Sequence, residues 1–486
     1  GADALGDGVA PHQHDLAAAP PDWDTLIELG LGQLTRPFGT SPVDPALGAR
    51  ALARTQAEIV AAGRHGIPAL AHEECLSGFM AWGATIYPTP LAWGATFDPH
   101  LVEAMAAQTG ASMRAAGVHQ GLAPVLDVTR DYRWGRVEET IGEDPYLVAT
   151  IGTAYVRGLE AAGVVATLKH FVGYSASRSG RNFGPVSAGP REIADMLLPP
   201  FEMAIRDGGA RSVMHAYTEI DGVPAAADAG LLTALLRDTW GFEGTVVSDY
   251  FGISFLQLLH KVAASESDAA AIALEAGIDV ELPTVHCFGR PLLDALQAGR
   301  LSEALVDRAT RRVLTQKCEL GLLDPDWYPE PPALVELEHG LDGDVDAARG
   351  SLAFDTTESR TLARRIAEES VVLVANSGAL PLGAASRIAV VGPRADDRLA
   401  MLGCYTFPSH VGSQHAELPF GVDVATLLEA LRSELPEATI EYVAGCDVDG
   451  TETSRFAAAQ EIARRADVCV VALGDRAGLF GRGTSG

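Results

Sequence analysis

The sequence predicts an α/β protein, in which a (β/α)8-type barrel is followed by a second, incomplete α/β sandwich domain. Three observations support this prediction. With 486 residues, the chain is too long for one ordinary domain. Short apolar runs alternate with segments of helical periodicity from about residue 67 onward. A stretch rich in Pro, Gly and acidic residues then separates a first series of such units from a second series.

Six apolar runs are the candidate strands of the first domain. They are rich in Val, Ile, Leu and Ala and lack a period of two, as expected of strands buried on both faces. In chain order they are "IPALAHEE" (67–74), "VHQGLAPVLDV" (118–128), "VVATLKHF" (164–171), "RSVMHAY" (211–217), "GTVVSDY" (244–250) and "AGIDVELP" (276–283). Segments such as 98–117 and 191–209 lie between them, with helical spacing and a final Gly.

Polar side chains at the ends of these runs favour a closed barrel over an open sheet. Functional groups at the carboxyl ends of many strands meet at one mouth only if the sheet closes. In an open sheet they would gather at a single switch point. The residues concerned are Glu73, Glu74, Asp127, Lys169, His170, His215, Tyr217, Asp249 and Asp279. We therefore expect a barrel over residues 1–320.

The second series of units predicts a separate layered domain over residues 361–486, after a linker at 321–360. Helical patterns are expected where the apolar spacing is three to four residues, and strands where apolar residues run together. The expected elements are helices at 360–370, 424–435 and 455–466, and strands at 371–376, 387–392, 439–445 and 467–474.

Composition and charge exclude several classes of partner. The formal net charge of −28 repels nucleic acid and anionic lipid, and no apolar run approaches the ~20 residues that cross a bilayer. The six cysteines form no CxxC pair, and His72, His119 and His215 lie on different runs, so neither a metal nor another cofactor is expected. Without a signal peptide pattern, a cytoplasmic location is predicted. The oligomeric state is left open, a homo-oligomer included.

Several long motifs resemble a known family. A mouth with carboxylates, a lysine, an arginine and aromatic side chains suits the recognition of sugar hydroxyls. "GIPALAHEECLSG", "RWGRVEETIGEDPYL", "LKHFVGY", "SVMHAYTEIDGVP" and "GTVVSDYFG" resemble, in this order, the barrel domain of glycoside hydrolase family 3. "VVLVANSGALPL" followed by "RIAVVGPRAD" resembles the opening of that family's sandwich domain, so the resemblance covers roughly residues 25–486.

The resemblance implies roles for four residues of the mouth. Asp249 matches the catalytic nucleophile, although from the residues alone it could equally cap a helix. Nearby cations would hold the pKa of an ionised nucleophile down. Lys169 and His170 match a pair that contacts sugar hydroxyls. Arg136 matches a sugar-binding arginine, in a motif where Tyr132 replaces the family's usual proline.

Three further residues are implied to bind the sugar. Glu74 matches a carboxylate that holds the far hydroxyls; members that cleave glucosides usually have Asp here, and xylosidase-like members often have Glu. The longer side chain would fill the space of a hydroxymethyl group, which favours a pentose. Tyr217 matches a tyrosine near the nucleophile, and Arg181 resembles an arginine after the "KHF" strand. The acidic segment 138–144 is interpreted instead as a structural network, with Asp144 capping a helix.

The implied function is an exo-acting retaining β-glycosidase that acts on small β-linked oligosaccharides or on aryl and alkyl glycosides. β-Xylosidase is the first expectation and β-glucosidase the alternative; a sugar-binding protein without catalysis is a third hypothesis. The final "GLFGRGTSG" has P-loop spacing at Gly478 and Gly483, but Thr484 stands where the motif requires lysine. Relatives often continue this loop with a glutamate that is the acid/base, which is therefore expected just beyond Gly486.

Overall fold

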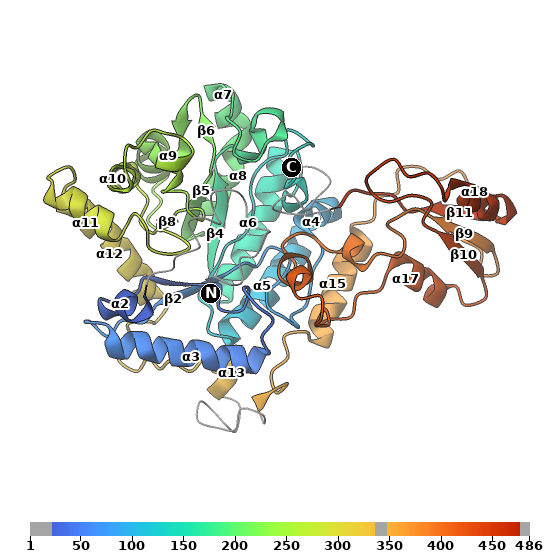
Figure 1. The fold of residues 1–486 in the computed structure, drawn as a ribbon, viewed down its shortest axis with the longest axis horizontal. Coiled ribbons are helices and arrows are strands. Elements are labelled where there is room, and N and C mark those ends of the chain that lie inside the picture. Colours follow the sequence, from blue (N-terminus) through green and yellow to red (C-terminus); the bar gives the residue numbers. More distant parts are fainter. Residues whose placement is uncertain (1–21, 336–347, 477–486) are drawn as a thin grey trace.

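The structure is a computed structural model that describes residues 22–335 and 348–476 (Figure 1). Strands β1 to β5 and β8 form one sheet with all neighbours parallel, in the order β1-β2-β3-β4-β5-β8. Their bounds are β1 Gln33–Thr35, β2 Leu70–Glu73, β3 Gln120–Gly121, β4 Val165–Phe171, β5 Ser212–His215 and β8 Thr245–Val247. The parallel α/β architecture expected from the sequence is thereby confirmed.

The hydrogen-bonded sheet forms a half barrel within the described residues. Beyond β8, the predicted strand at 276–283 contributes an isolated parallel bridge between Val247 and Val280. The hydroxyl of Thr35, on β1, donates to the Pro283 carbonyl at 2.5 Å, so the two ends of the sheet approach each other. Pro283 has no N–H to donate to a ladder, which is a physical reason for a bridge here rather than a full strand.

Helices cover the outside of this sheet, and three of the long ones begin alike. Asp44, Asp98 and Asp144 each precede a proline, and each side chain accepts backbone N–H groups of the first turn. This pairing satisfies donors that the helix leaves free and uses the fixed φ of proline. The helices around the barrel are α2 Trp23–Glu28, α3 Pro45–Ala62, α4 Pro90–Thr96, α5 Pro99–Ala115, α6 Pro145–Ala161, α7 Pro190–Glu192, α8 Pro199–Arg206, α9 Phe255–Leu258, α10 Glu266–Ala276, α11 Arg290–Gln297, α12 Glu303–Glu319 and α13 Pro332–Val335. Two π-helical segments, Ile193–Leu197 and Gly230–Thr239, complete this layer.

The core lies between the sheet and these helices. All seven residues of β4 are buried, as the absence of a two-residue period predicted. Trp93 of α4 stacks on Tyr155 of α6 with ring centroids 5.0 Å apart, which locks two helices of this layer together. Among the described residues, none of the helices is long and apolar enough to span a membrane.

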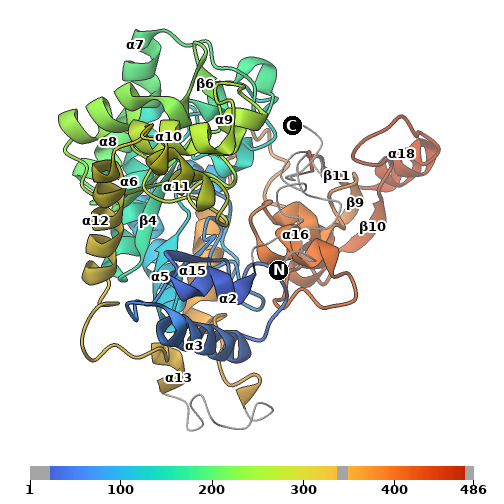
Figure 2. The ribbon, with the colours of Figure 1, turned by 60° about the vertical axis from the view of Figure 1, so that its left-hand side comes forward.

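The second domain has a three-stranded parallel sheet, in the order β10-β9-β11. Its elements are β9 Arg387–Val391, α16 Phe407–His410, α17 Leu427–Glu434, β10 Thr439–Val443, α18 Phe456–Arg465 and β11 Val468–Val471. Ile388 and Val390 of β9 pack with Leu428 of α17 to form its core. The preceding helix, α15 Thr357–Glu369, packs against the barrel, where its Ile366 joins the buried core. Figures 1 and 2 show this sheet to one side of the barrel, and Figure 2 places α16 between the two.

One expected strand of the second domain is wrong. Residues 371–376 form no strand, and the side chains of Val371, Leu373 and Val374 are exposed. An extended segment needs a neighbouring strand to satisfy its N–H and C=O groups, and no sheet of the described residues includes this one. The apolar run therefore indicates residues with high β propensity, but it does not indicate whether a neighbouring strand will pair with them. Of the predicted linker at 321–360, residues 336–347 lie outside the described residues.

Candidate functional site

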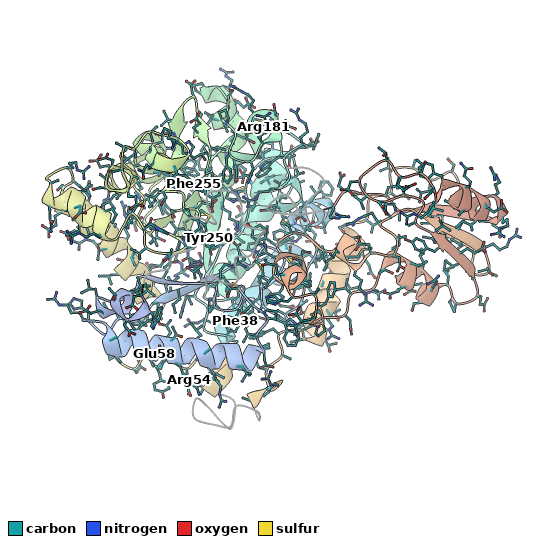
Figure 3. The ribbon with its side chains drawn as sticks, viewed as in Figure 1. Phe38, Arg54, Glu58, Arg181, Tyr250 and Phe255 are labelled. Atoms are coloured by element: carbon teal, nitrogen blue, oxygen red, sulfur yellow. The ribbon has the colours of Figure 1, made fainter. Side chains whose placement is uncertain are left out.

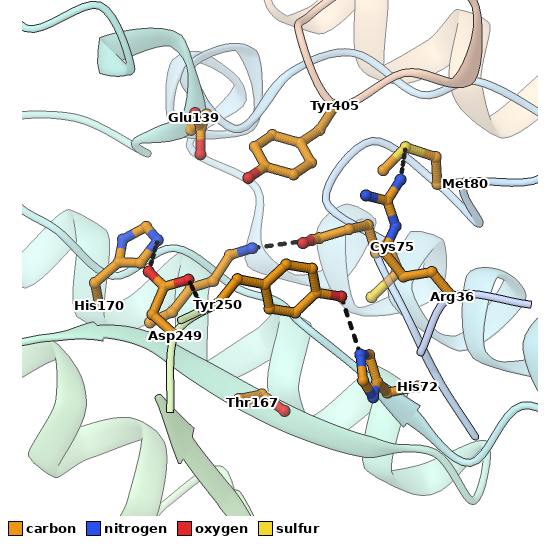
Figure 4. Close-up of polar contacts among 12 residues, drawn as sticks. Arg36, His72, Cys75, Met80, Glu139, Thr167, His170, Asp249, Tyr250 and Tyr405 are labelled. Atoms are coloured by element: carbon orange, nitrogen blue, oxygen red, sulfur yellow. Dashed lines mark hydrogen bonds and ion pairs between the residues drawn. The ribbon is translucent and has the colours of Figure 1, made fainter. Parts of the chain in front are cut away.

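The carboxyl ends of several barrel strands bring the predicted polar residues together (Figure 4). Glu74 follows β2, Lys169 and His170 lie near the end of β4, and Asp249 comes two residues after β8. All four are buried. Because parallel strands end at the same edge of a sheet, residues that lie far apart in the sequence share one mouth.

Asp249 is buried, and only one of its two carboxylate oxygens accepts a hydrogen bond from the described residues. Oδ1 accepts the backbone N–H of Tyr250 at 2.8 Å. Oδ2 has no hydrogen-bond partner among the described residues and lies 3.9 Å from Nε2 of His170. Burial raises the pKa of Asp249 to about 6, although Arg136 and Lys169 act in the opposite direction. The expectation that cations keep this pKa down is corrected: they moderate the rise, but desolvation is the larger effect.

Lys169 and Glu74 form a buried ion pair. Nζ of Lys169 lies 2.9 Å from Oε2 of Glu74, and both side chains are almost completely shielded from solvent. A buried ammonium group requires a partner, because removal from water alone would cost several kcal/mol. Glu74 is the charged partner of Lys169, and the pair presents one donor group and one acceptor group side by side.

His170 is a neutral hydrogen-bond acceptor at this site. Its backbone N–H (3.0 Å) and its Nδ1 (2.8 Å) both contact Oδ2 of Asp127. A guanidinium group can only donate, so Nε2 accepts from Nη2 of Arg136 at 3.1 Å, and the ring proton lies on Nδ1, which faces Asp127. Burial and the Arg136 and Lys169 cations hold the pKa of His170 well below its ordinary range, while burial raises the pKa of Asp127 to about 7.

Arg136 is fixed by the acidic segment that follows it. Its guanidinium makes two hydrogen bonds to Glu139, at 2.7 and 2.8 Å, and lies over the ring of Tyr174. Such a two-point contact orients the planar group as a single hydrogen bond would not. Asp144 caps α6 as predicted. The acidic segment therefore has the structural role that the sequence analysis gave it.

Two predicted residues differ in their placement. Tyr217 donates its hydroxyl to the carbonyl of Tyr250, the residue after Asp249, at 2.7 Å. Arg181 is exposed, and Figure 3 shows it well apart from Tyr250. The structure thus brings Tyr217 to the site and leaves Arg181 outside it.

Sequence reasoning missed four residues of the site. Tyr250 directly follows the nucleophile candidate, and its hydroxyl lies 3.0 Å from Nε2 of His72. Its place beside Asp249 in the sequence could alone have revealed it. Asp127 ends an apolar run but was given no role. Arg36 and Tyr405 carry no local signal, because they reach the site from distant segments. Nζ of Lys169 lies 4.8 Å from the centroid of the Tyr405 ring, which the second domain provides (Figure 4).

The chemistry of the site is that of polyol recognition around a carboxylate. His72, His119 and His215 each have a hydrogen-bond partner of their own. Within residues 22–335 and 348–476, no group of His, Cys, Asp and Glu side chains is arranged to hold a metal ion. The terminal segment 478–486, with its expected approach to the acid/base, lies outside the described residues.

Comparisons with known proteins agree with this geometry. The glycosyl hydrolase family 3 N terminal domain matches residues 22–316, and the C-terminal domain of the same family matches residues 371–483. A "Beta-xylosidase" of Formosa agariphila is 34% identical over 86% of this chain and 58% of its own length. A "Periplasmic beta-glucosidase" of Salmonella typhimurium is 32% identical over 66% of this chain and 41% of its own length.

Solved structures give the same result. A β-glucosidase of Erythrobacter marinus superposes with a TM-score of 0.78 at 33% identity, covering 98% of this chain and 66% of that chain. A β-glucosidase of Listeria innocua in complex with glucose superposes with a TM-score of 0.75 at 28% identity, covering 96% and 64%. The chain spans about half the length of the curated relatives it matches. On the two domain matches and this shared fold, the chain belongs to glycosyl hydrolase family 3.

Proposed function

We propose that this chain carries the nucleophile and the sugar subsite of an exo-acting, retaining β-glycosidase that prefers β-xylosides. The observation that carries the proposal is Oδ2 of Asp249, which has no hydrogen-bond partner among the described residues and lies beside a neutral histidine, with the Arg136 and Lys169 cations acting on the same carboxylate. A buried carboxylate whose one oxygen has no protein partner is available to form a bond with substrate. The family membership supports the same assignment.

Asp249 acts as the nucleophile in this proposal. Its Oδ2 bonds to the anomeric carbon while the bond from that carbon to the glycosidic oxygen breaks, and a general acid protonates the departing oxygen. Water then attacks the same carbon, releases Asp249 and passes its proton to the acid's conjugate base. Two inversions restore the original β configuration. With a pKa of about 6, Asp249 is mostly ionised at neutral pH, as attack requires.

The sugar subsite comprises Glu74, Lys169, His170, Arg136 and Tyr217. Lys169 donates, Glu74 accepts, and Nε2 of His170 can accept from a sugar hydroxyl in place of Arg136. Charged hydrogen-bond partners strengthen such contacts. Arg181 is not proposed as a part of this subsite, because it is exposed. Small β-linked oligosaccharides and aryl or alkyl glycosides are the proposed substrates. The Listeria innocua β-glucosidase has been solved in complex with glucose, and a mutant of it in complex with laminaribiose.

Preference for a pentose rests on Glu74. Its side chain is one methylene longer than Asp and, bound to Lys169, extends the carboxylate into the subsite. That space would hold the hydroxymethyl group of a hexose. β-Glucosidase is the second candidate, because several relatives and solved neighbours have that name. The predicted cytoplasmic location stays a prediction, and one relative is named as periplasmic.

The test compares aryl xyloside and aryl glucoside hydrolysis by the same enzyme preparation, so that partial misfolding cancels in the ratio. We expect faster xyloside turnover, and we expect Glu74→Asp to shift the ratio toward the glucoside by roughly 10-fold, about the value of one methylene group. Faster glucoside turnover with no shift in Glu74→Asp would refute the pentose argument. Sugar binding without hydrolysis of either substrate would support the non-catalytic alternative.

A further inference from the structure

A chain of side chains connects the barrel to the aromatic ring that covers the sugar subsite. Nη1 of Arg36, which follows β1, lies 3.3 Å from Nε2 of His410 in α16. The imidazole of His410 stacks on the ring of Tyr405, with centroids 5.2 Å apart and an interplanar angle of 22°. Figure 4 shows the Tyr405 ring on the second-domain segment, between Glu139 on one side and Arg36 with Met80 on the other.

The chemistry of this contact fixes the state of His410. A guanidinium group can only donate hydrogen bonds, so Nε2 of His410 must accept, and the imidazole is neutral with its proton on Nδ1. Arg36 is itself held, because its Nη2 donates to the Gly39 carbonyl and contacts Sδ of Met80. The barrel therefore holds Arg36, Arg36 contacts the His410 ring, and the His410 ring stacks on the ring of Tyr405.

The other contacts of Tyr405 are with residues of the proposed subsite. Nζ of Lys169 lies 4.8 Å from the Tyr405 centroid, and the Tyr405 hydroxyl lies 3.4 Å from Nη2 of Arg136. Neighbouring Cys404 donates its N–H to Glu138 of the barrel at 2.6 Å. The aromatic ring thus closes the space above two cations that have been assigned to sugar binding. A small rotation of this ring would change the height of the subsite.

We propose that Arg36 and His410 are positioning residues that hold the Tyr405 ring over the Lys169–Glu74 pair. This inference rests on the proposed function for the identity of the ligand. Neither residue touches the sugar: His410 acts through Tyr405, and Arg36 acts through His410. The second domain consequently contributes to sugar affinity through a ring whose orientation the barrel sets.

A double-mutant cycle tests this order of action. Xylose binding is measured by calorimetry for wild type, His410→Ala, Tyr405→Ala and the double variant. We expect His410→Ala to weaken binding roughly 3- to 10-fold, the range of one stacking contact, and to have no further effect once Tyr405 is alanine. An equal loss in both backgrounds would overturn the proposal, because His410 would then act independently of Tyr405.

Two additional measurements separate positioning from general damage. His415→Ala is the matched control, since this residue pairs with Glu417 in the same segment and should leave the affinity unchanged. In hydrolysis of an aryl xyloside, His410→Ala should raise KM several-fold and change kcat by less than about 2-fold, because uniform binding is lost. A fall in kcat without a change in KM would contradict a positioning role.

Hydrogen exchange provides a readout that does not depend on sugar. Without the His410 contact, the amide protons of Cys404 and Thr406 should exchange roughly 10-fold faster, whereas His415→Ala should leave them unchanged. Unchanged exchange in His410→Ala would overturn the positioning role, whatever the sugar results. If wild type binds neither xylose nor glucose, the proposed function fails, while the exchange rates still decide whether His410 holds the Tyr405 segment.

Discussion

All seven residues of β4 are buried, whereas every residue of β10 and β11 is at least partly exposed. The buried sheet carries Lys169 and His170, which need fixed partners because charge and polarity are costly in a buried place. The partly exposed strands β10 and β11 carry none of the proposed subsite residues, and the second domain reaches the site through the Tyr405 segment instead. The barrel therefore holds Lys169 and His170 between fixed partners, whereas the second domain contributes the Tyr405 ring that lies over Lys169.

Breaking the buried ion pair should produce the largest effect on stability. Lys169→Met leaves the Glu74 carboxylate buried without its cation, which we expect to lower the free energy of unfolding by about 3–5 kcal/mol. Urea unfolding followed by tryptophan fluorescence measures the change. The double variant Lys169→Met/Glu74→Gln should recover most of the loss, because no uncompensated charge remains.

An exposed pair supplies the control for this prediction. Arg364 and Glu368 lie on the surface of α15 at 2.7 Å, and Arg364→Ala should change stability by less than about 1 kcal/mol. If the double variant were as unstable as Lys169→Met alone, the loss would come from packing rather than from the stranded charge. The difference in stability loss between the buried and the exposed ion pair would then not arise from electrostatics.

A smaller effect, of opposite sign, is expected at Asp249. Its pKa in the folded protein is raised to about 6 from the ordinary 3.8, so the folded state disfavours the ionised form. The resulting cost is absent below about pH 4, grows as the pH rises and is complete above about pH 6. Asp249→Asn should therefore stabilise the protein by on the order of 1–3 kcal/mol at pH 8 and have little effect at pH 4. Lys169 and Arg136 keep their own carboxylate partners in this variant.

Unfolding at the two pH values measures this difference. Equal stabilisation at pH 4 and pH 8 would show that the Asp249 charge does not carry the cost. The same property should appear in catalysis, where kcat/KM should fall as the pH drops below about 6, since the nucleophile must be ionised.

The smallest effect is expected in the exposed region of the second domain. Val374 is 91% exposed, so Val374→Ser should change stability by no more than about 0.5 kcal/mol. Val390 of β9 is fully buried, and the same substitution there should cost roughly 2–3 kcal/mol. Equal losses at the two positions in urea unfolding would mean that residues 371–376 are packed after all.

The sequence predicted those parts of the site that follow a buried strand. Glu74, Lys169, His170 and Asp249 each come at the end of an apolar run, so the strand pattern placed them at one mouth. Tyr405 could not be predicted in this way, because its position depends on how the second domain docks. The raised pKa of Asp249 could not be predicted from the sequence either, because it results from burial in the folded protein, which no local sequence pattern indicates.

The fold was predictable to a similar extent. Apolar runs identified the strands that have neighbours, including β9, β10 and β11. The run at 371–376 has the same composition but no neighbour in the described residues, and pairing is a property of the whole sheet. The run at 276–283 yields only a bridge at Val280, where proline limits further pairing. Arg181 was assigned from a motif alone and lies on the surface.

Asp249 is proposed to form a covalent bond with the sugar, and trapping that bond tests this role most directly. A dinitrophenyl 2-deoxy-2-fluoro-β-xyloside has a leaving group that needs no protonation, so labelling depends on the nucleophile and not on the acid. Mass spectrometry of digested protein should find one fluorosugar on the peptide containing Asp249, and none in Asp249→Ala. A label on another carboxylate, or equal labelling of Asp249→Ala, would contradict the assignment.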